Sequence, residues 1–507
     1  MTINFIPNDP LAVSAVPMRQ KTPHADRPAN RAGFIFSNIA PEGLFNPGTP
    51  QFLFWQCREA ALLAVEVWEA LAGPLTKWAR ATPNIKKLRL LQDNGDDLNA
   101  FYNGQSLSFF HHPTGSKTTF SGASTDVVAH ESGHGFLDVI RPDLWSSMLT
   151  ETGAFHEAFG DCMALLTAFS DQISRQKLLS VSPTLAAQNF LEATAEDLSD
   201  GVRRALGATH PAAKPRHAFN NFQWQLPTTL PTSGGPDVLT SEVHSFARVF
   251  SGCFYDTVSN IFAAAPVKNE AALLKAAQTA GKLLIAGAKG APLVPRFFQA
   301  VGRAMVLADQ TMNAGANHTA IVRAFARHNI ALGSSAMLAP RATLAGNAPK
   351  FAAKGQILSA ATTKDLKRRM GAAASARLAV SAVEIGGDKV AQAVHSREVS
   401  LGSLSNQLKG VVAVVTEPVL VGASGGRAAA LSAMPDSSAT NDEVLTFVET
   451  LLKNDHIDLG TGKKGAAASS RKAVVASETS ARKTHTIRTR GGKKTLERLG
   501  FVCRHCG

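Results

Sequence analysis

The stretch that most constrains this 507-residue chain is STDVVAHESGHGFLDV, residues 124–139, where two histidines stand four residues apart with a glutamate after the first. Apolar residues recur around them at helical spacing and a Ser-Thr pair can cap the start, so the pattern predicts a helix over residues 124–140. On a helix, His130 and His134 lie one turn apart on one face, where both imidazoles can reach one metal ion. Glu131 then points beside them towards the place of a bound water.

A catalytic zinc ion takes three protein ligands and leaves its fourth position to water. The third ligand is expected on a neighbouring helix, and the stretch ETGAFHEAFGDCMALL predicts one over residues 151–169. Glu157 offers a carboxylate ligand, and Asp161, one turn later, can accept the free N–H of a ligand imidazole and fix its tautomer. His156 is the competing ligand, but it lies off the face that carries Glu157 and Asp161.

Composition and length predict a globular protein of two or three domains, because 45% of the residues are hydrophobic. The first twenty residues lack the basic start and apolar run of a secretory signal, and no later stretch has the length of a membrane span. Five scattered cysteines argue against a disulfide framework. We therefore expect a cytoplasmic protein in a reducing compartment, with export by a signal-independent route left open.

Changes in amino-acid composition along the chain predict five parts. The strongest boundary falls near Gly333, after which Ala, Gly and Ser dominate and aromatic residues become rare. The parts are an irregular N-terminal segment (1–48), an N-terminal lobe with the metal helices (49–170), a helical lobe (171–333), an Ala/Gly-rich extension (334–460) and a basic tail (461–507). Within the extension, VVAVV predicts a short strand and NDEVLTFVETLLKN an amphipathic helix.

The tail carries twelve Lys/Arg against two glutamates, whereas the rest of the chain is nearly neutral. Such a segment is usually a solvated end, and the alternative is a weak, non-specific contact with a polyanion such as nucleic acid. The CRHC motif at the very end, with Cys503 and Cys506, is half of a zinc knuckle; a lone CxxC is more often inert or redox-labile than metal-bound.

Four motifs in order resemble the thermolysin family of zinc peptidases. NAFYNGQSLSFF (99–110) resembles the strand that lines the family's substrate cleft, and SGASTDVVAHESGH its approach to the zinc helix. ETGAFHEAFGD resembles the second metal helix, and ANHTAIVRAFARHNIAL (316–332) the helix that closes the catalytic region. The resemblance covers about residues 50–333. It implies an α+β fold with a mixed β/α N-terminal lobe, a helical C-terminal lobe and a cleft between them, followed here by the extension.

The resemblance also implies residue roles. His130, His134 and Glu157 match the zinc ligands, Glu131 the general base, and Asp161 the partner of the first histidine. The remaining matches are His244, which donates to the oxyanion; Asn99 and Ala100, which pair with the substrate backbone; and Arg204, which contacts a substrate carbonyl.

The chain also departs from the family pattern. The family's tyrosine before the second metal helix has no clear counterpart in RPDLWSSMLTE, where Trp145 is a candidate donor. The usual aspartate partner of the family histidine is replaced by Leu239, with Glu242 or Asp237 as substitutes. The acidic cluster that binds paired calcium ions is largely absent, so a calcium requirement is doubtful.

The leading interpretation is therefore a zinc endopeptidase that hydrolyses peptide bonds with a metal-activated water. The apolar Val127 and Phe120 lie where the family builds its pocket, which predicts a hydrophobic residue after the scissile bond. The alternative is a catalytically weak binding protein that keeps the peptidase fold and is recruited to an anionic partner through its basic tail.

Overall fold

The computed structural model describes residues 2–333, 358–385, 388–424, 427–430, 437–453, 456–459 and 485–498. Within these ranges the protein combines long helices with several sheets, which confirms the α+β class predicted from the sequence. The tail segment from Lys463 to Lys483 and the CRHC motif lie outside the described residues, so the expectations for them stay as predictions.

A four-stranded sheet with the order β3-β4-β6-β5 forms one side of the N-terminal lobe. The first three strands run parallel. Strand β5 lies at the end of the sheet and pairs with β6 in the antiparallel direction. Strand β5 is thus an edge strand of this sheet, and its residues Ala100 and Tyr102 are fully buried. The strands of this lobe are β1 (Ile3–Phe5), β2 (Arg19–Lys21), β3 (Gly33–Phe36), β4 (Lys87–Leu91), β5 (Ala100–Tyr102), β6 (Ser106–Phe109), β7 (His111–Thr114) and β8 (Lys117–Phe120).

Three long helices form the interior of this lobe: α1 (Pro50–Ala72), α2 (Thr125–Ile140) and α3 (Thr150–Ser170). Helix α2 packs on both of the others, and α2 and α3 carry the polar motifs. The start of α1 follows helix rules closely, since Thr49 caps it through its side chain and proline occupies the first position. Gly73, with φ of 83°, ends it. Helices α2 and α3 agree with the predicted ranges to within one residue at each end. Nearly all their residues are buried, so both lie inside the lobe.

Two glycines set the distance between α2 and α3. A Cβ on Gly133 would lie 2.9 Å from the Cα of Gly160, and a Cβ on Gly160 would lie 2.6 Å from Cε1 of His130. No larger side chain fits at either position without moving its neighbour. The absence of side chains here lets the two helices approach closely enough for residues of both to meet at one point.

The second lobe, residues 171–333, is mainly helical. The sequence predicts a loop-rich stretch over about 170–240, and the structure places two helices and two short strands within it. The elements of this lobe are α4 (Gln172–Val181), β9 (Ala193–Thr194), α5 (Glu196–Leu206), β10 (Arg216–His217), α6 (Val243–Ala263), α7 (Glu270–Gly290), α8 (Phe297–Met312) and α9 (His318–Arg327).

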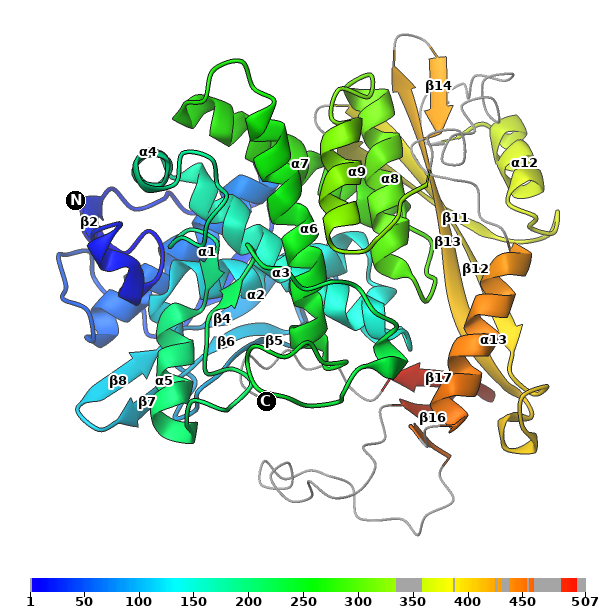
Figure 1. Ribbon diagram of the computed structural model, residues 1–507, viewed down its shortest axis with the longest axis horizontal. Coiled ribbons are helices and arrows are strands. Elements are labelled where there is room, and N and C mark those ends of the chain that lie inside the picture. Colours follow the sequence, from blue (N-terminus) through cyan, green and yellow to red (C-terminus); the bar gives the residue numbers. More distant parts are fainter. Residues whose placement is uncertain are drawn as a thin grey trace.

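The extension forms a third body built on a seven-stranded sheet with the order β11-β12-β13-β17-β16-β15, and β14 beside β13. In Figure 1 its long strands stand between α8 and α9 on one side and α12 on the other. Its elements are α12 (Ala360–Arg369), β11 (Leu378–Ile385), β12 (Asp388–Ser400), β13 (Val411–Ser424), β14 (Arg427–Ala430), α13 (Ser437–Lys453), β15 (Ile457–Asp458), β16 (His485–Arg490) and β17 (Lys493–Arg498).

Alternation along the strands gives this sheet two apolar faces. Ala391, Ala393, Val419 and Val421 pack with α12 in a separate small cluster. Val390 and Leu420, which alternate with these residues, join the main cluster that also contains the cores of both lobes, as do Ala413 and Val415 nearer the start of β13. The described parts of the extension therefore share a hydrophobic core with residues 2–333.

Hydrogen bonds reinforce this contact, which we call the seam. The N–H of Leu293 donates to the carbonyl of Thr416 over 2.9 Å, and the Gln392 amide donates to the carbonyl of Lys289 over 2.9 Å. The Thr416 hydroxyl bonds the Asp143 carboxylate. The predicted boundary near Gly333 is thus a change in amino-acid composition, and the described residues on its two sides pack against each other.

Three details differ from the sequence expectations. The segment 1–48, expected to be irregular, contains β1, β2 and β3, and β3 joins the main sheet of the lobe. The stretch 99–110, expected as one strand, is the hairpin β5–β6, because Gly104 takes a φ of 85° that favours glycine and turns the chain. The strand expected over VVAVV extends to fourteen residues in β13.

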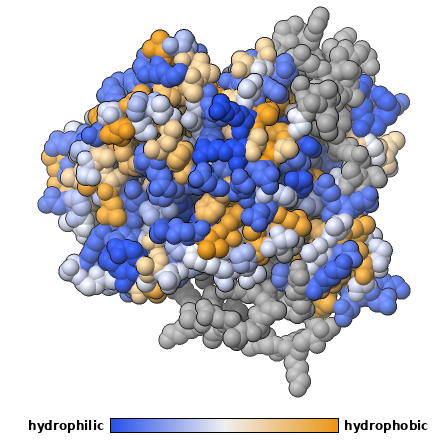
Figure 2. All heavy atoms as spheres, viewed as in Figure 1, coloured by the Kyte–Doolittle hydropathy of each residue, from blue (hydrophilic) through white to orange (hydrophobic). Residues whose placement is uncertain are grey.

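Polar residues cover much of the face shown in Figure 2, with apolar residues scattered among them. The described helices include none that is both long and apolar enough to cross a membrane. The three described cysteines, Cys57, Cys162 and Cys253, are free and buried in the core, and burial raises the pKa of each thiol well above its usual range.

Candidate metal centre and active site

Helices α2 and α3 bring His130, His134 and Glu157 together in the interior. Their ligand atoms all lie within 4.8 Å of one another, and all three residues are buried. Nε2 of His130 is 3.0 Å from Nε2 of His134 and 3.3 Å from Oε2 of Glu157. The ligand atoms of the three residues therefore converge on one point.

The other ring nitrogen of each histidine has its own partner. Nδ1 of His130 lies 3.0 Å from Oδ1 of Asp161, and Nδ1 of His134 lies 3.0 Å from Nδ1 of His156. Burial lowers the pKa of His156 to about 3, so its ring is neutral and its Nδ1 can accept a hydrogen bond from the Nδ1–H of His134. These contacts leave both ε nitrogens directed at the common point. The structure places His156 behind a histidine of the cluster.

Two further residues hold Asp161 in place. Nη2 of Arg216 donates to its Oδ1 over 2.6 Å, and the Ser251 hydroxyl donates to its Oδ2 over 2.9 Å. Burial alone would raise the pKa of Asp161, but Arg216 and His130 keep it below its usual value. Asp161 is therefore an ionised acceptor for the Nδ1–H of His130.

The chemistry of the donor set fits zinc. Zinc binds neutral imidazole and carboxylate ligands, and two histidines with one glutamate is a ligand set of catalytic zinc sites. Burial would raise the pKa of Glu157, but the histidines 244, 134 and 130 hold it well below its usual range, so the carboxylate is ionised. Both of its oxygens are buried without a hydrogen-bond donor, as expected of groups shaped to bind a cation.

Glu131 and His244 stand beside this cluster. Burial raises the pKa of Glu131 to about 7, opposed by His130 and reinforced by Glu157. Nε2 of His244 lies 3.3 Å from Oε1 of Glu157. Burial would lower the pKa of His244, but the carboxylates of Glu157 and Glu242 raise it above its usual value.

Glu242 has two roles at the start of α6. Its carboxylate caps the helix by accepting the N–H groups of His244 and Ser245, and its Oε1 lies 2.7 Å from Nδ1 of His244. The contact orients the His244 ring so that Nε2 faces the cluster. Of the two substitutes considered for the family's aspartate, Glu242 fills the place, while Asp237 pairs with Lys214 at 2.6 Å.

Asn99 precedes β5 and Ala100 begins it, at an edge of the four-stranded sheet, and both residues are buried. Ala100 pairs with Phe109 of β6, and Asn99 lies within 3.4 Å of Asp97 through its amide. An edge strand in this position can bind an extended peptide by adding it to the sheet.

The structure does not bring Arg204 to the cluster. Its guanidinium is held by Asp200, by the carbonyl of Thr114 and by the hydroxyl of Thr119, on α5 and the β7–β8 hairpin. The arginine at the cluster is Arg216, whose Nη1 lies 4.0 Å from Glu157. Arg204, expected to contact the substrate, therefore lies away from the cluster, and Arg216 lies beside it. In sequence, Arg216 lies in the proline-rich stretch HPAAKPRH, which gives no helical periodicity from which to place it.

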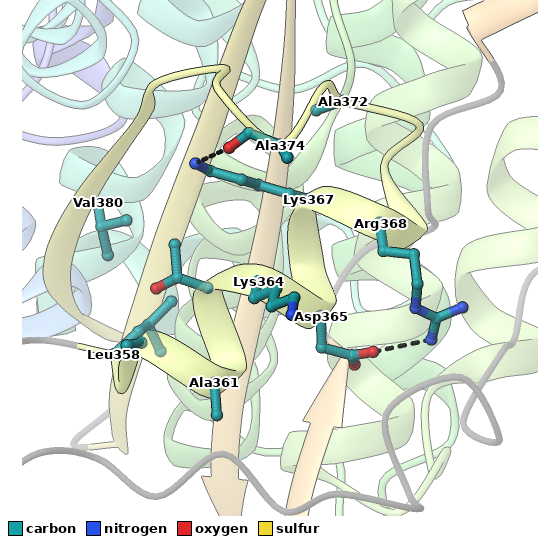
Figure 3. Close-up of a pocket in the computed structure, with 11 residues that line it drawn as sticks. Leu358, Ala361, Lys364, Asp365, Lys367, Arg368, Ala372, Ala374 and Val380 are labelled. Atoms are coloured by element: carbon teal, nitrogen blue, oxygen red, sulfur yellow. Dashed lines mark hydrogen bonds and ion pairs between the residues drawn. The ribbon is translucent and has the colours of Figure 1, made fainter.

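A small cavity of about 120 Å³ adjoins His244 and Arg216. Its walls come from α5, β10 and the loop before α6, and include Ala195, Ala212 and Pro215. A larger cavity of about 1000 Å³ lies in the extension, between α12 and β11 (Figure 3). It is lined by alanines and by Lys364, Lys367 and Arg368, and the chemistry described above is centred on other elements. The small cavity is the one that belongs to the site.

The ligand set formed by an HExxH helix and a glutamate on the next long helix fits that of the thermolysin-like zinc peptidases. More particularly, residues 99–336 match the model of the fungalysin metallopeptidase family, M36. The matched region contains the whole metal cluster, Glu131 and His244. The protein is thus a zinc metalloendopeptidase that acts on proteins or peptides. No curated protein matches the chain.

Proposed function

We propose that His130, His134 and Glu157 hold the zinc ion of this peptidase and that Glu131 is its general base. The convergence of the three ligand atoms within 4.8 Å is the observation that carries the proposal. When bound, zinc supplies the Lewis acidity that makes water a nucleophile near neutral pH. Glu131 follows His130 on α2 but lies outside the ligand set, so its carboxylate is free of the metal and serves proton transfer.

The chain's own groups then carry the proton and orient the substrate. Glu131, with a pKa of about 7, takes the proton of the attacking water and passes it to the leaving amine. His244, oriented by Glu242, donates from Nε2 to the carbonyl oxygen of the scissile bond. The edge strand β5, with Asn99 and Ala100, binds the peptide as an added strand, and Arg216 supports the cluster through Asp161.

For the residue after the scissile bond we propose a small hydrophobic side chain. The cavity beside His244 has a volume of about 120 Å³, which admits one side chain, and alanine and proline residues form part of its wall. Val127, for which a role in this pocket was expected, is fully buried. Hydrolysis of a peptide series that differs only at this position tests the proposal, with Ala or Val cleaved faster than Phe or Asp.

We also propose that the enzyme needs no calcium. Asp126, just ahead of the zinc helix residues, has its carboxylate filled by the N–H groups of Ala195 and Val127 and by the hydroxyl of Ser124. Protein donors thus occupy oxygens that would otherwise be offered to a cation.

For the basic tail we propose only weak, salt-dependent contact with polyanions. Its described part, β16 and β17, exposes Arg488, Arg490, Lys493 and Lys494 on one hairpin, but Glu497 and Glu398 pair with three of them. Because Phe501 is the one Phe, Trp or Tyr of the tail sequence, base stacking would be minor and contact would rest mainly on charge.

Glu131→Gln is the direct test of the assignment of the base. The variant keeps the shape of the side chain but cannot accept a proton, so activity on a peptide substrate falls by at least about 10²-fold while the zinc content stays at one ion per chain. Glu196→Gln is a matched control, because the pKa of Glu196 is also raised to about 7 but its side chain lies at the start of α5. An active Glu131→Gln enzyme contradicts the proposal.

A further inference from the structure

The hairpin β16–β17 at the end of the described chain is anchored on the start of α3. His485 and Arg498 stand directly opposite each other at its open end. The buried His485 ring bonds the carbonyl of Met148 through Nε2 and contacts Phe447 edge-on, with ring centroids 6.0 Å apart. In Figure 1 the arrow of β17 points from the extension towards the catalytic lobes. The hairpin thus directs residue 498 at the helix that carries Glu157.

The guanidinium of Arg498 fills the space left by a glycine of α3. A Cβ on Gly153 would lie 2.1 Å from Nη1 of Arg498 and 3.0 Å from Cγ1 of Val243. Gly153 is four residues before Glu157, so the two share one face of α3 a single turn apart. Val243 precedes His244 at the start of α6. The guanidinium therefore lies between the helix starts that present the metal ligand Glu157 and the donor His244.

One hydrogen-bond donor in this region lacks an acceptor among the described residues: Nη1 of Arg498 is buried and without a hydrogen-bond partner. Nε2 of His244 is buried too and faces Oε1 of Glu157 at 3.3 Å, an oxygen of a proposed metal ligand. Burial lowers the pKa of Arg498, opposed by the nearby carboxylates of Glu242 and Glu157. An unsatisfied buried donor is costly, and more so when it is charged, so the place of Arg498 favours an acceptor that binds there.

We propose that Arg498 is a catalytic residue supplied by the C-terminal extension, which donates from Nη1 to the carbonyl oxygen of the scissile peptide bond beside His244. The inference rests on the proposed peptidase function of the site. As the water oxygen bonds to the carbonyl carbon, the electron pair of the C=O bond moves onto that oxygen, and a fixed cation is more favourable for this oxyanion than for the neutral carbonyl. The extension thereby completes an active site whose metal ligands all come from α2 and α3.

The test compares full-length variants. Arg498→Gln lowers kcat about 100-fold with little change in KM, because the contact strengthens only in the transition state. Arg498→Lys restores part of kcat. Gly153→Ala, which leaves the arginine in the chain but fills its place, lowers kcat to a similar extent, and the double variant is no worse than either single one. Arg490→Gln, an exposed arginine of the same hairpin, is the matched control and keeps full activity.

A binding measurement separates catalysis from mere docking of the hairpin. By calorimetry, Arg498→Gln weakens binding of a tetrahedral phosphorus-containing peptide analogue about 100-fold and leaves the affinity for a product peptide unchanged, with zinc content and thermal midpoint as in the natural chain. Equal loss for both ligands, or loss of zinc, shows a structural role and overturns the inference. Unchanged or increased activity of Arg498→Gln also overturns it. If the natural chain itself cleaves no peptide, both the proposed function and this inference are contradicted. If the natural chain and Arg498→Gln are equally active, only this inference is contradicted.

Discussion

The contact between α2 and α3 and the seam between the catalytic lobes and the extension are held in different ways. At the first, glycines allow two buried helices to touch, and Gly133 lies against the backbone of Gly160. At the second, apolar side chains of a sheet cover helices α7 and α8, with a few hydrogen bonds such as that from Gln392 to Lys289. The contact between α2 and α3 has no room for an added atom, whereas the seam consists of many apolar contacts, each of which can be lost without losing the others. Small changes should therefore break the metal site, and only large ones should break the seam.

The largest effect is expected from Gly160→Ala. Its methyl group would lie 2.6 Å from Cε1 of His130, so the imidazole has to leave its place between Asp161 and Glu157. Peptidase activity should fall by at least about 10³-fold, the order expected when a metal ligand is displaced from a catalytic site. Metal analysis should show a matching loss of zinc.

Gly402→Ala is the control for this change, because its Cβ would meet nothing closer than 3.7 Å in the extension. It should keep both zinc and activity. A Gly160→Ala protein with a full zinc complement would show that the helices can separate, and that the contrast between the two contacts is smaller than their geometry indicates.

The seam should break when the extension is removed. A chain that ends after residue 340 loses the partners of Leu293 and Lys289 and exposes apolar surface of α7 and α8. Loss of even two fully buried aliphatic contacts, at roughly 1.5 to 3 kcal/mol each, lowers the thermal midpoint by on the order of 10 °C. Differential scanning calorimetry of both chains measures it. An unchanged thermal midpoint would show that residues 49–333 fold as an independent unit, as the change in amino-acid composition near Gly333 suggests.

The metal cluster and its surroundings also show which site residues can be predicted from the sequence. His130, His134, Glu157 and Asp161 were all accessible to prediction because the helical repeat fixes which residues share a face. Arg216 was missed in favour of Arg204, since a proline-rich loop has no repeat from which to place a side chain. Contacts between distant segments leave no local pattern at all.

The extension illustrates this last limit. The spacing of its residues predicted a helix near 441–454 and a strand at VVAVV, and both exist as α13 and β13. Strands β16 and β17 lie in a stretch that charge alone marked as a solvated tail. They pair with β13 and β15 across long separations in sequence, and pairing of that kind is specified by tertiary contacts that no short window contains.

A smaller effect should appear at Lys289, which lies at the seam. Burial lowers the pKa of this lysine to about 8 from 10.5. Below pH 8 both folded and unfolded chains hold the proton, and the folded state bears the cost of the buried charge. Between pH 8 and 10.5 the folded chain releases the proton first, so stability rises with pH, by on the order of 3 kcal/mol at most.

Lys289→Met should raise the free energy of unfolding at pH 7 and remove this rise, as measured by urea denaturation across the pH range. Lys275→Met, on the exposed side of the same helix, is the control and should leave the pH dependence in place. The same slope in the Lys289→Met chain would mean that another group causes it.

The smallest effect is expected from calcium. Because Asp126 is already bonded to protein donors, a calcium-selective chelator should shift the thermal midpoint by less than about 1 °C. A zinc-selective chelator should abolish activity in the same buffer. A large drop in the midpoint on calcium removal alone would reveal a cation site that stabilises the lobes independently of the zinc cluster.

The three buried thiols can serve as probes of local opening in the interior of this molecule. Cys57 lies on α1, Cys162 on α3 and Cys253 on α6, and a reagent in solution can reach none of them while these helices stay packed. Since the reactive species is the thiolate, whose formation burial suppresses, alkylation must wait for each helix to open. The alkylation rate of each cysteine, measured separately in the chain of natural sequence, would therefore report how often that part of the interior is exposed to water.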